Sequence, residues 1–215
     1  LALWLRPQDP WLGQGAVVAA GAYADRLGLE GLPPQAEVLA LHTIFELQRA
    51  TGARVHLSRL SSAGGLELLR AARREGLPVS ADVSASSLHL TDVDIGYFNT
   101  DFHLRPPLRG QRDRDAIQAA LREGLVEALC SDHALVDDAG KSAPFPYSQP
   151  GATGLELLLS LALKWARDSR VPLPLALARV TSGPAAVLRS LRPTLSGLGQ
   201  LGVGAPADLC LVNLE

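Results

Sequence analysis

The chain has 215 residues, of which 47% are hydrophobic and 20% charged, so it can bury a substantial core as one large globular domain or part of one. Its net charge of -2 argues against a nucleic-acid-binding surface, and no apolar stretch reaches the roughly 18 to 20 residues that span a bilayer. No basic segment of a signal peptide opens the sequence, so we expect a cytoplasmic protein.

Two further compositional features concern the chain's extent and its cysteines. The sequence contains no methionine, and we expect it to be the C-terminal portion of a longer chain. Its two cysteines, Cys130 and Cys210, lie far apart in predicted core strands. We therefore expect reduced structural thiols rather than a disulfide framework or a cysteine-based metal site.

The first part of the chain alternates apolar runs with helical patterns. Residues 1–5 form a fully apolar run, which is typical of a buried parallel strand. Helical spacing follows over residues 16–27 and 35–50, and Gly52 is positioned to end the second helix. Glu37 lies near the start of that helix, where we expect it to stabilise the helix dipole.

The same alternation continues to the end of the chain. Further strands are predicted to begin at Arg54 and to cover 77–83 and 126–130, and further helices are predicted over 65–75, up to Trp165, and over 173–188. Alternating strands and helices predict an α/β fold with a parallel sheet. The carboxyl ends of parallel strands meet at one edge, so we expect Arg6, Arg59, Asp82 and Asp132 to converge there.

One strand end carries a recognisable motif. The apolar run 126–130 leads into Asp132 and His133, the layout by which α/β barrels present catalytic groups. A structural alternative is that both residues only cap the next segment. The stretch resembles the D-H-A-P-H motif of dihydroorotases, cyclic amidohydrolases in which that Asp binds metal and serves as general base. Leu135 and Val136 stand where the motif has Pro and a second His.

Other segments resemble the same family in the same order along the chain. They are Arg6-Pro7-Gln8-Asp9 (family H-x-E-D), 56–63 (H-x-x-H-x-S-T/S-A), 85–91 (P-x-H-L-x-L-T), 104–109 (N-P-P-L-R), 150–156 (P-G-x-x-G-L-E) and 202–209 (G-x-G-x-x-A-D-L). The resemblance implies the C-terminal part of a (β/α)8 TIM-type barrel over residues 1–195. It also implies a final strand, within residues 196–215, that returns to a small β domain.

The resemblance is strong in the segments that build the fold and weak at the positions that bind metal or substrate in the family. Two zinc-ligating histidines of the family fall on Arg6 and Arg59, whose guanidinium groups offer only donors and stay protonated. Ser87 and Arg105 replace a family His and a substrate-contacting Asn. We therefore expect no metal and no cofactor. Instead, we expect guanidinium charge to replace metal charge, with Asp132 paired to Arg59 or Arg6.

A few family site positions are retained. The resemblance implies that Asp132 is a vestigial general base and that Arg109, Pro150 and Gly151 are vestigial substrate-binding residues. His56 lies three residues before the second substituted ligand position, on the opposite side of the strand's pleat. We therefore expect a structural role for His56 rather than a role as a substitute ligand.

Two functional hypotheses follow. In the first, the chain is an inactive dihydroorotase homologue, similar to the inactive dihydroorotase-like chains that hold aspartate transcarbamoylase in a large complex in some bacteria. This hypothesis implies pyrimidine biosynthesis, a transcarbamoylase partner and an oligomer. In the second, it is an active zinc-dependent cyclic amidohydrolase with an atypical site, which hydrolyses dihydroorotate to carbamoyl aspartate or acts on a related cyclic amide. Tightly bound stoichiometric zinc together with hydrolysis would favour the second hypothesis.

Overall fold

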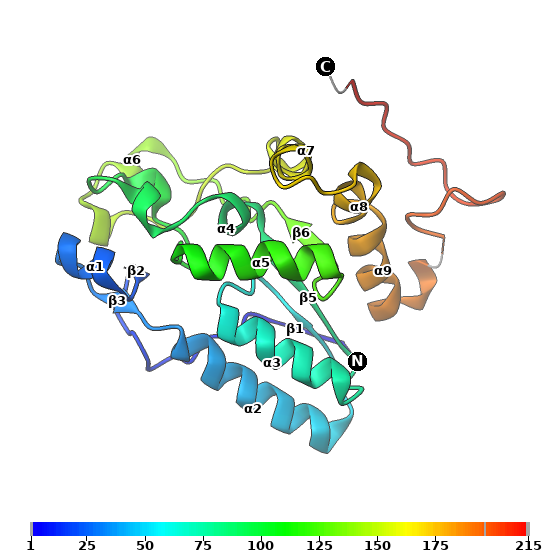
Figure 1. Ribbon diagram of the computed structural model, residues 1–215, viewed down its shortest axis with the longest axis horizontal. Coiled ribbons are helices and arrows are strands. Elements are labelled where there is room, and N and C mark those ends of the chain that lie inside the picture. The colour runs from blue at the N-terminus through cyan, green and yellow to red at the C-terminus, as the bar shows by residue number, and fades with distance from the viewer. Residues whose placement is uncertain (1, 196, 214–215) are drawn as a thin grey trace.

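A parallel sheet of four strands forms the centre of the molecule (Figure 1). The computed structural model describes residues 2–195 and 197–213. The strands are β1 (Ala2–Leu5), β4 (Arg54–Leu57), β5 (Val79–Ser84) and β6 (Ala128–Cys130), and they pair in the order β1-β4-β5-β6. All the pairings between them are parallel, so each strand is reached by a crossover connection. This arrangement confirms the predicted α/β class.

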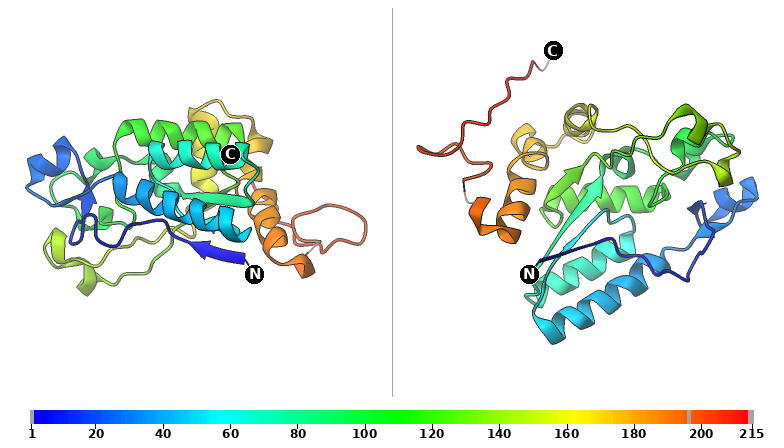
Figure 2. Two further views of the ribbon diagram at one scale, coloured as in Figure 1. Left: turned by 90° about the horizontal axis from the view of Figure 1, so that it is seen from below. Right: turned by 180° about the vertical axis from the view of Figure 1, so that it is seen from behind.

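The long helices pack against the sheet to form the main core. They are α2 (Gln35–Thr51), α3 (Ala63–Arg74), α5 (Gln111–Glu123) and α7 (Leu158–Asp168). The first three lie side by side (Figures 1 and 2). Alternate strand residues such as Val55, Leu57 and Ala81 bury their side chains against Leu69 and Trp165 of the helices. Within the described residues, no helix is long and apolar enough to cross a membrane.

Local signals in the sequence explain where two of these helices begin and end. Gly52 ends α2 in the left-handed conformation, with φ of 65°, which glycine adopts without steric cost. Ser62 caps α3, because its side chain accepts a hydrogen bond of 3.0 Å from the backbone N–H of Gly65. The helix end at Gly52 confirms the sequence prediction, and Ser62 is a residue type that is typical of a helix N-cap.

The helix predicted over residues 16–27 is wrong in its first half. Only α1 (Ala22–Leu27) is helical, and the preceding β2 (Val18–Ala19) pairs in parallel with β3 (Gly31–Leu32). The backbone N–H groups of Val17 and Ala20 donate to the Glu30 and Leu32 carbonyls. Backbone groups committed to another strand cannot close helical hydrogen bonds, so pairing overrides the helical spacing of the apolar residues.

The burial predicted for the first strand is also wrong. Within β1, the side chains of Leu3 and Trp4 are 39% and 54% exposed. In the described part of the chain β1 pairs with β4 alone, so it is an edge strand and lacks cover on its far side. Trp4 nevertheless packs across the register on His56, with 4.2 Å between the ring centroids.

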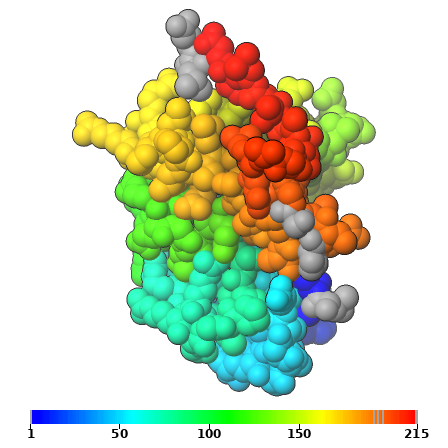
Figure 3. Space-filling model, turned by 90° about the vertical axis from the view of Figure 1, so that its right-hand side faces the viewer, coloured from blue at the N-terminus to red at the C-terminus, as the bar shows by residue number. Residues whose placement is uncertain are grey.

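The C-terminal third differs from its prediction in two ways. Residues 173–188, expected as one helix, form α8 (Leu173–Ala178) and α9 (Ser182–Leu191), with a break at Thr181. Residues 197–213 contain no strand, and this segment runs along the outside of the molecule (Figures 1 and 3). It includes Cys210, which is exposed rather than buried in a core strand. A strand needs a neighbouring strand for its backbone hydrogen bonds, and none of the described strands pairs with this segment. The division into domains at residue 196 stays a prediction.

The loops that follow the strands pack on one another in a second, smaller core. Its buried residues include Val17, Ile95, Leu108 and Phe145. The Pro- and Ser-rich composition of residues 141–150 predicts a mobile loop, but Phe145 is only 2% exposed and anchors the segment. This core fixes the position of residues 103–109 beside the strand ends. The remaining short elements are α4 (Ala85–His89), α6 (Asp138–Lys141), and the 3-10 helices Asp92–Ile95, Thr100–Phe102, Phe145–Tyr147 and Pro193–Leu195.

Candidate functional site at the carboxyl edge of the sheet

The residues that follow the strands meet at one edge of the sheet, as predicted. The backbone N–H of Arg59, after β4, donates a hydrogen bond of 2.8 Å to Oδ1 of Asp82 in β5. The Nη1 atom of the same arginine donates to Oδ1 of Asp132, after β6, at 2.5 Å. Arg6, after β1, lies close enough for its pKa to be affected by the charges of Arg59 and Asp132.

An ion pair joins the side chains of Asp132 and Arg59 at this edge of the sheet. The side chains are 14% and 28% exposed, so water shields the pair only in part. Burial raises the pKa of the Asp132 carboxyl, and the hydrogen bond from Arg59 opposes that rise. The pairing expected from the sequence is therefore present, and its partner is Arg59 rather than Arg6.

Three arginine side chains form a cluster around this pair. Partial burial lowers the pKa of Arg6, and the positive charges of Arg59 and Arg105 lower it further, whereas Asp132 raises it. Arg59 Nη1 also donates to the backbone carbonyl of Arg105 at 3.2 Å. We call Arg6, Arg59 and Arg105 the arginine cluster. It gathers more positive charge than Asp132 alone can balance.

Asp82 is the buried hub beneath the cluster. It is 4% exposed, and its Oδ2 lies 2.9 Å from Nε2 of His56 while its Oδ1 also accepts from Sγ of Cys130 at 3.2 Å. His56 is 1% exposed and its Nδ1 lies 2.8 Å from Oγ of Ser80. Burial, with the Asp82 charge, raises the pKa of the Cys130 thiol, which favours a protonated donor. These contacts fit a structural role for His56.

Two residues of the site have a strained backbone. Arg59 and Asp132 have φ angles of 58° and 48°, in the left-handed region that side chains bearing a Cβ rarely occupy. Such a conformation costs on the order of 1 kcal/mol for each residue. Each lies two residues after the end of a strand, β4 or β6, and both belong to the same ion pair. The strained backbone therefore lies at the two residues that form the ion pair at this edge of the sheet.

Comparison with known proteins shows where the chain belongs. No family model matches it. A dihydroorotase-like protein of Pseudomonas putida is 41% identical over 213 residues, which are 99% of this chain and 49% of that protein. A dihydroorotase of Anaeromyxobacter dehalogenans is 36% identical over 217 residues, 99% of this chain and 48% of that protein. The chain is a dihydroorotase homologue. It spans about half the length of the curated relatives it matches.

Solved structures agree on the fold. The chain superimposes on L-hydantoinase (dihydropyrimidinase) of Arthrobacter aurescens with a TM-score of 0.82 and 23% identity, over 96% of this chain and 46% of that one. A dihydroorotase of Saccharomyces cerevisiae in complex with 5-fluoroorotic acid gives a TM-score of 0.68 at 16% identity, over 86% of this chain and 49% of that one. These similarities confirm the predicted fold, part of the TIM-type barrel of the amidohydrolase superfamily.

The side chains at this homologue's strand ends do not fit a zinc ion. Zinc is bound by lone pairs of nitrogen, oxygen or sulfur, whereas the guanidinium groups of Arg6 and Arg59 offer only donors. The two carboxylates of this edge are already engaged, because Asp132 accepts from Arg59 and Asp82 accepts from the Arg59 backbone N–H and from Cys130. Among the residues that the structure describes, no group of three or more His, Cys, Asp or Glu side chains could hold a metal ion.

The Pro150-Gly151 turn lies beside the segment that follows β6. Gly151 has φ of 141°, and a Cβ added there would lie 2.8 Å from Cβ of Ala134, so only glycine fits this close approach. The Gly151 N–H donates to the backbone carbonyl of His103 at 2.8 Å. His133 accepts at Nδ1 from the backbone of residues 154 and 155, at 3.3 and 3.4 Å. The turn's backbone donors are thus used within the protein.

Arg109 and Ser87 have partners outside the arginine cluster. Arg109 is 6% exposed, and it donates from Nε to Oγ of Ser61 at 2.8 Å and from Nη1 to the carbonyl of Leu32 at 3.5 Å. Ser87 is buried against Ser84, with 2.9 Å between the hydroxyl oxygens. These bonds join Arg109 to the residue before the α3 cap and to β3, and the substrate contact that the resemblance implies for Arg109 stays a prediction.

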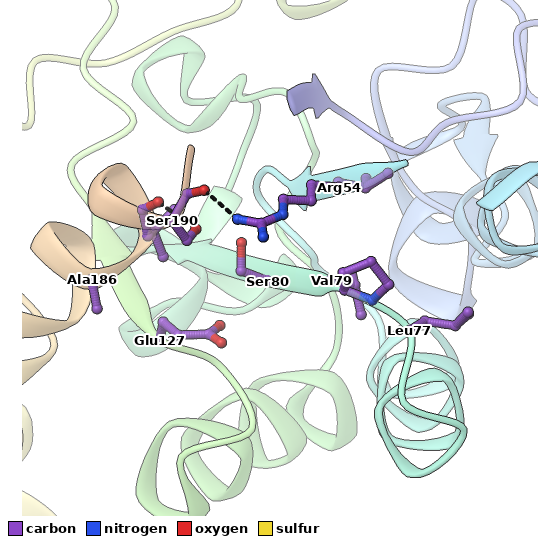
Figure 4. A pocket seen from close by; sticks show the side chains of 10 residues that line it. Arg54, Leu77, Val79, Ser80, Glu127, Ala186 and Ser190 are labelled. Atoms are coloured by element: carbon purple, nitrogen blue, oxygen red, sulfur yellow. Dashed lines mark hydrogen bonds between the residues drawn. The ribbon is translucent and has the colours of Figure 1, made fainter. Parts of the chain in front are cut away.

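Two cavities lie at opposite ends of the sheet. One, at the amino ends of the strands, has a volume of about 290 Å³ (Figure 4). Its polar lining is engaged: Arg54 donates to the Ser190 carbonyl at 2.8 Å, and Glu127 accepts from Arg73 and from the Ala81 N–H. The other has a volume of about 180 Å³ and adjoins the arginine cluster through Arg105.

Proposed function

We propose that this protein is a catalytically inactive dihydroorotase homologue that acts as a structural partner of aspartate transcarbamoylase in pyrimidine biosynthesis. The observation that supports inactivity best is the ion pair of Arg59 and Asp132, at 2.5 Å. A hydrolytic zinc site needs several lone-pair ligands and an open position for water. Here the retained carboxylate is already paired with a guanidinium group.

Electrostatics adds to this argument. A divalent ion about 5 Å from one guanidinium group is repelled by roughly 7 kcal/mol at an effective dielectric constant of about 20. Each guanidinium group of the arginine cluster adds to this repulsion, while the charge of Asp132, which raises the pKa of Arg6, opposes it. The site therefore disfavours zinc through its charge as well as through its lack of lone pairs.

The partner is proposed by analogy with inactive dihydroorotase-like chains, since the fold alone does not determine function. If the site no longer catalyses hydrolysis, the feature of the chain that selection maintains is a surface that binds a partner. The alternative is an active cyclic amidohydrolase, and the retention of Asp132 and His133 favours it. Such an enzyme would need metal ligands from outside this chain or from residues that replace the two lost histidines.

Removal of the full-length protein from its native cell tests this proposal. We expect aspartate transcarbamoylase to migrate as a smaller or less stable assembly in size-exclusion chromatography of the lysate. A full-length Arg6→His/Arg59→His variant should restore the assembly as well as the wild type does, because neither change creates or removes an outer surface. If the transcarbamoylase migrates identically with and without the protein, and the purified wild type hydrolyses dihydroorotate, the enzyme alternative stands instead.

A further inference from the structure

A serine, a histidine and an aspartate form a hydrogen-bonded chain across two strands of the sheet. The hydroxyl of Ser80 in β5 lies 2.8 Å from Nδ1 of His56 in β4, and Nε2 of the same ring lies 2.9 Å from Oδ2 of Asp82. Ser80 and Asp82 are two residues apart in β5, and His56 pairs with Ser80 in the register, so all three side chains point to one face of the sheet. Their order is that of nucleophile, base and orienting carboxylate in a Ser-His-Asp triad.

The protonation of the imidazole follows from its two neighbours. An ionised carboxylate can only accept, so Nε2 of His56 carries a proton and donates it to Asp82. In the neutral ring Nδ1 then keeps its lone pair, and the Ser80 hydroxyl is its donor. This tautomer can take a proton from a serine that attacks a substrate.

Packing holds the imidazole in this orientation. His56 and Asp82 are 1% and 4% exposed, and Trp4 packs on the imidazole from β1 with 4.2 Å between the ring centroids. The other carboxylate oxygen of Asp82 accepts from the backbone N–H of Arg59, so the carboxylate cannot turn away from the ring without losing that bond. The contacts that give His56 its structural role therefore also orient it as a general base.

Ser80 is the member of this chain that a substrate can reach. It is half-buried and lies among the residues that line the cavity of about 290 Å³ at the amino ends of the strands. Figure 4 shows its hydroxyl pointing into that cavity, toward the guanidinium group of Arg54. Within the described residues, Arg54 uses only an Nη1 N–H group, which donates to the Ser190 carbonyl. Its remaining N–H groups can stabilise an oxyanion that forms at Ser80.

The rest of the cavity lining favours a small substrate with an apolar group. Several of its side chains are apolar, among them Leu77, Val79 and Val187. A volume of about 290 Å³ lies at the lower end of the range for small-molecule sites, which limits the apolar group to a short chain. The carboxylate of Glu127 at the cavity already accepts from Arg73 and from the Ala81 N–H.

We propose that Ser80 is a nucleophile, with His56 as its general base, and that this site hydrolyses neutral esters of short-chain carboxylic acids. Ser80 Oγ attacks the ester carbonyl carbon while its proton passes to Nδ1 of His56, and Arg54 stabilises the oxyanion. The C–O bond to the alcohol breaks as His56 returns the proton to the leaving oxygen, which leaves an acyl-serine. Water then adds to the acyl carbon and gives a proton to His56. The carboxylic acid leaves as that proton returns to Ser80.

This inference does not depend on the proposed scaffold role, because the cavity lies at the end of the sheet away from the arginine cluster. A fluorophosphonate probe tests the nucleophile directly in the full-length protein. An activated serine displaces fluoride from the phosphorus atom, and mass spectrometry of the digested protein then locates the modified residue. We expect covalent modification of Ser80 in the wild type.

Ser190→Ala is the matched control. Ser190 lines the same cavity, but its hydroxyl donates to the Val187 carbonyl within α9 rather than to an imidazole. Arg54 binds the backbone carbonyl of residue 190, which alanine keeps. The probe should therefore modify Ser80 in this variant as fully as in the wild type.

Hydrolysis of p-nitrophenyl butyrate measures the activity. Ser80→Ala should lower kcat/KM at least about a hundredfold, and Arg54→Gln should lower kcat about a hundredfold because an oxyanion donor is lost. Arg54 is exposed, so its variant should fold normally, and circular dichroism checks the fold of each variant. The proposal is overturned if the probe leaves wild-type Ser80 unmodified, if Ser80→Ala or Arg54→Gln hydrolyses the ester as fast as the wild type, or if Ser190→Ala loses as much activity as Ser80→Ala.

Discussion

Replacing Glu37 by alanine is expected to lower the free energy of unfolding by about 3 to 5 kcal/mol. Glu37 is 3% exposed, and its carboxylate accepts four hydrogen bonds of 2.6 to 2.9 Å from the backbone N–H and hydroxyl groups of Ser61 and Ser62. These serines begin α3, so the carboxylate stabilises the N-terminus of a neighbouring helix. We had expected it to act on its own helix, α2.

Urea unfolding followed by circular dichroism measures this effect, with Glu46→Ala as the matched control. Glu46 lies on the same helix, but its side chain is 73% exposed and pairs with Arg49 at the surface. Its loss should change the unfolding free energy by about 0.5 kcal/mol or less. Glu37→Gln should fall between the two, because an amide has one acceptor oxygen. Equal effects for the alanine variants at 37 and 46 would contradict this explanation.

Replacing Asp82 by alanine is expected to cost about 2 to 4 kcal/mol of unfolding free energy. The change leaves Nε2 of the buried His56 and the backbone N–H of Arg59 without their acceptor. It also removes a contact that holds Arg59 in its left-handed conformation. Asp82→Asn should cost less, since its amide oxygen can still accept one of these bonds.

Thermal and urea unfolding of both variants can be compared with Asp115→Asn. Asp115 is also a carboxylate next to an arginine, but its side chain is 55% exposed and it pairs with Arg114 at 3.2 Å. We expect a change of about 0.5 kcal/mol or less for this control. An Asp82→Ala protein as stable as the control would show that the buried hub contributes little to the fold.

Periodicity in the sequence predicts the sheet and most of the helices correctly. Strand ends follow directly from apolar runs, so the convergence of Arg59, Asp82 and Asp132 was predictable. The errors occur where tertiary pairing decides the outcome. Val17 and Val18 favour a strand by residue type although the apolar spacing around them fits a helix, and pairing with segment 30–32 decides for the strand. The exposure of Trp4 depends on which strands lie beside β1. The residue type at position 4 does not indicate whether β1 is an edge strand.

The chemistry of the site is predictable only in part. The residue types at 6, 59 and 132 predict an arginine–carboxylate pair, but whether Arg6 or Arg59 binds Asp132 depends on the left-handed turns at residues 59 and 132. No pattern signals those turns, because neither position is a glycine. The contact of His103 was missed for a different reason. Its hydrogen-bond partner, Ser148, lies 45 residues away in sequence, and that contact exists only in the folded chain.

Zinc titration of the metal-free full-length protein tests most directly whether guanidinium charge has replaced the metal. Competition with a chromogenic chelator gives the affinity, and elemental analysis of the purified protein gives the stoichiometry. We expect substoichiometric zinc and no tight binding in the wild type, while Arg6→His/Arg59→His should gain affinity because two lone-pair donors join Asp132. One tightly bound zinc per wild-type chain would contradict the proposed loss of the metal site.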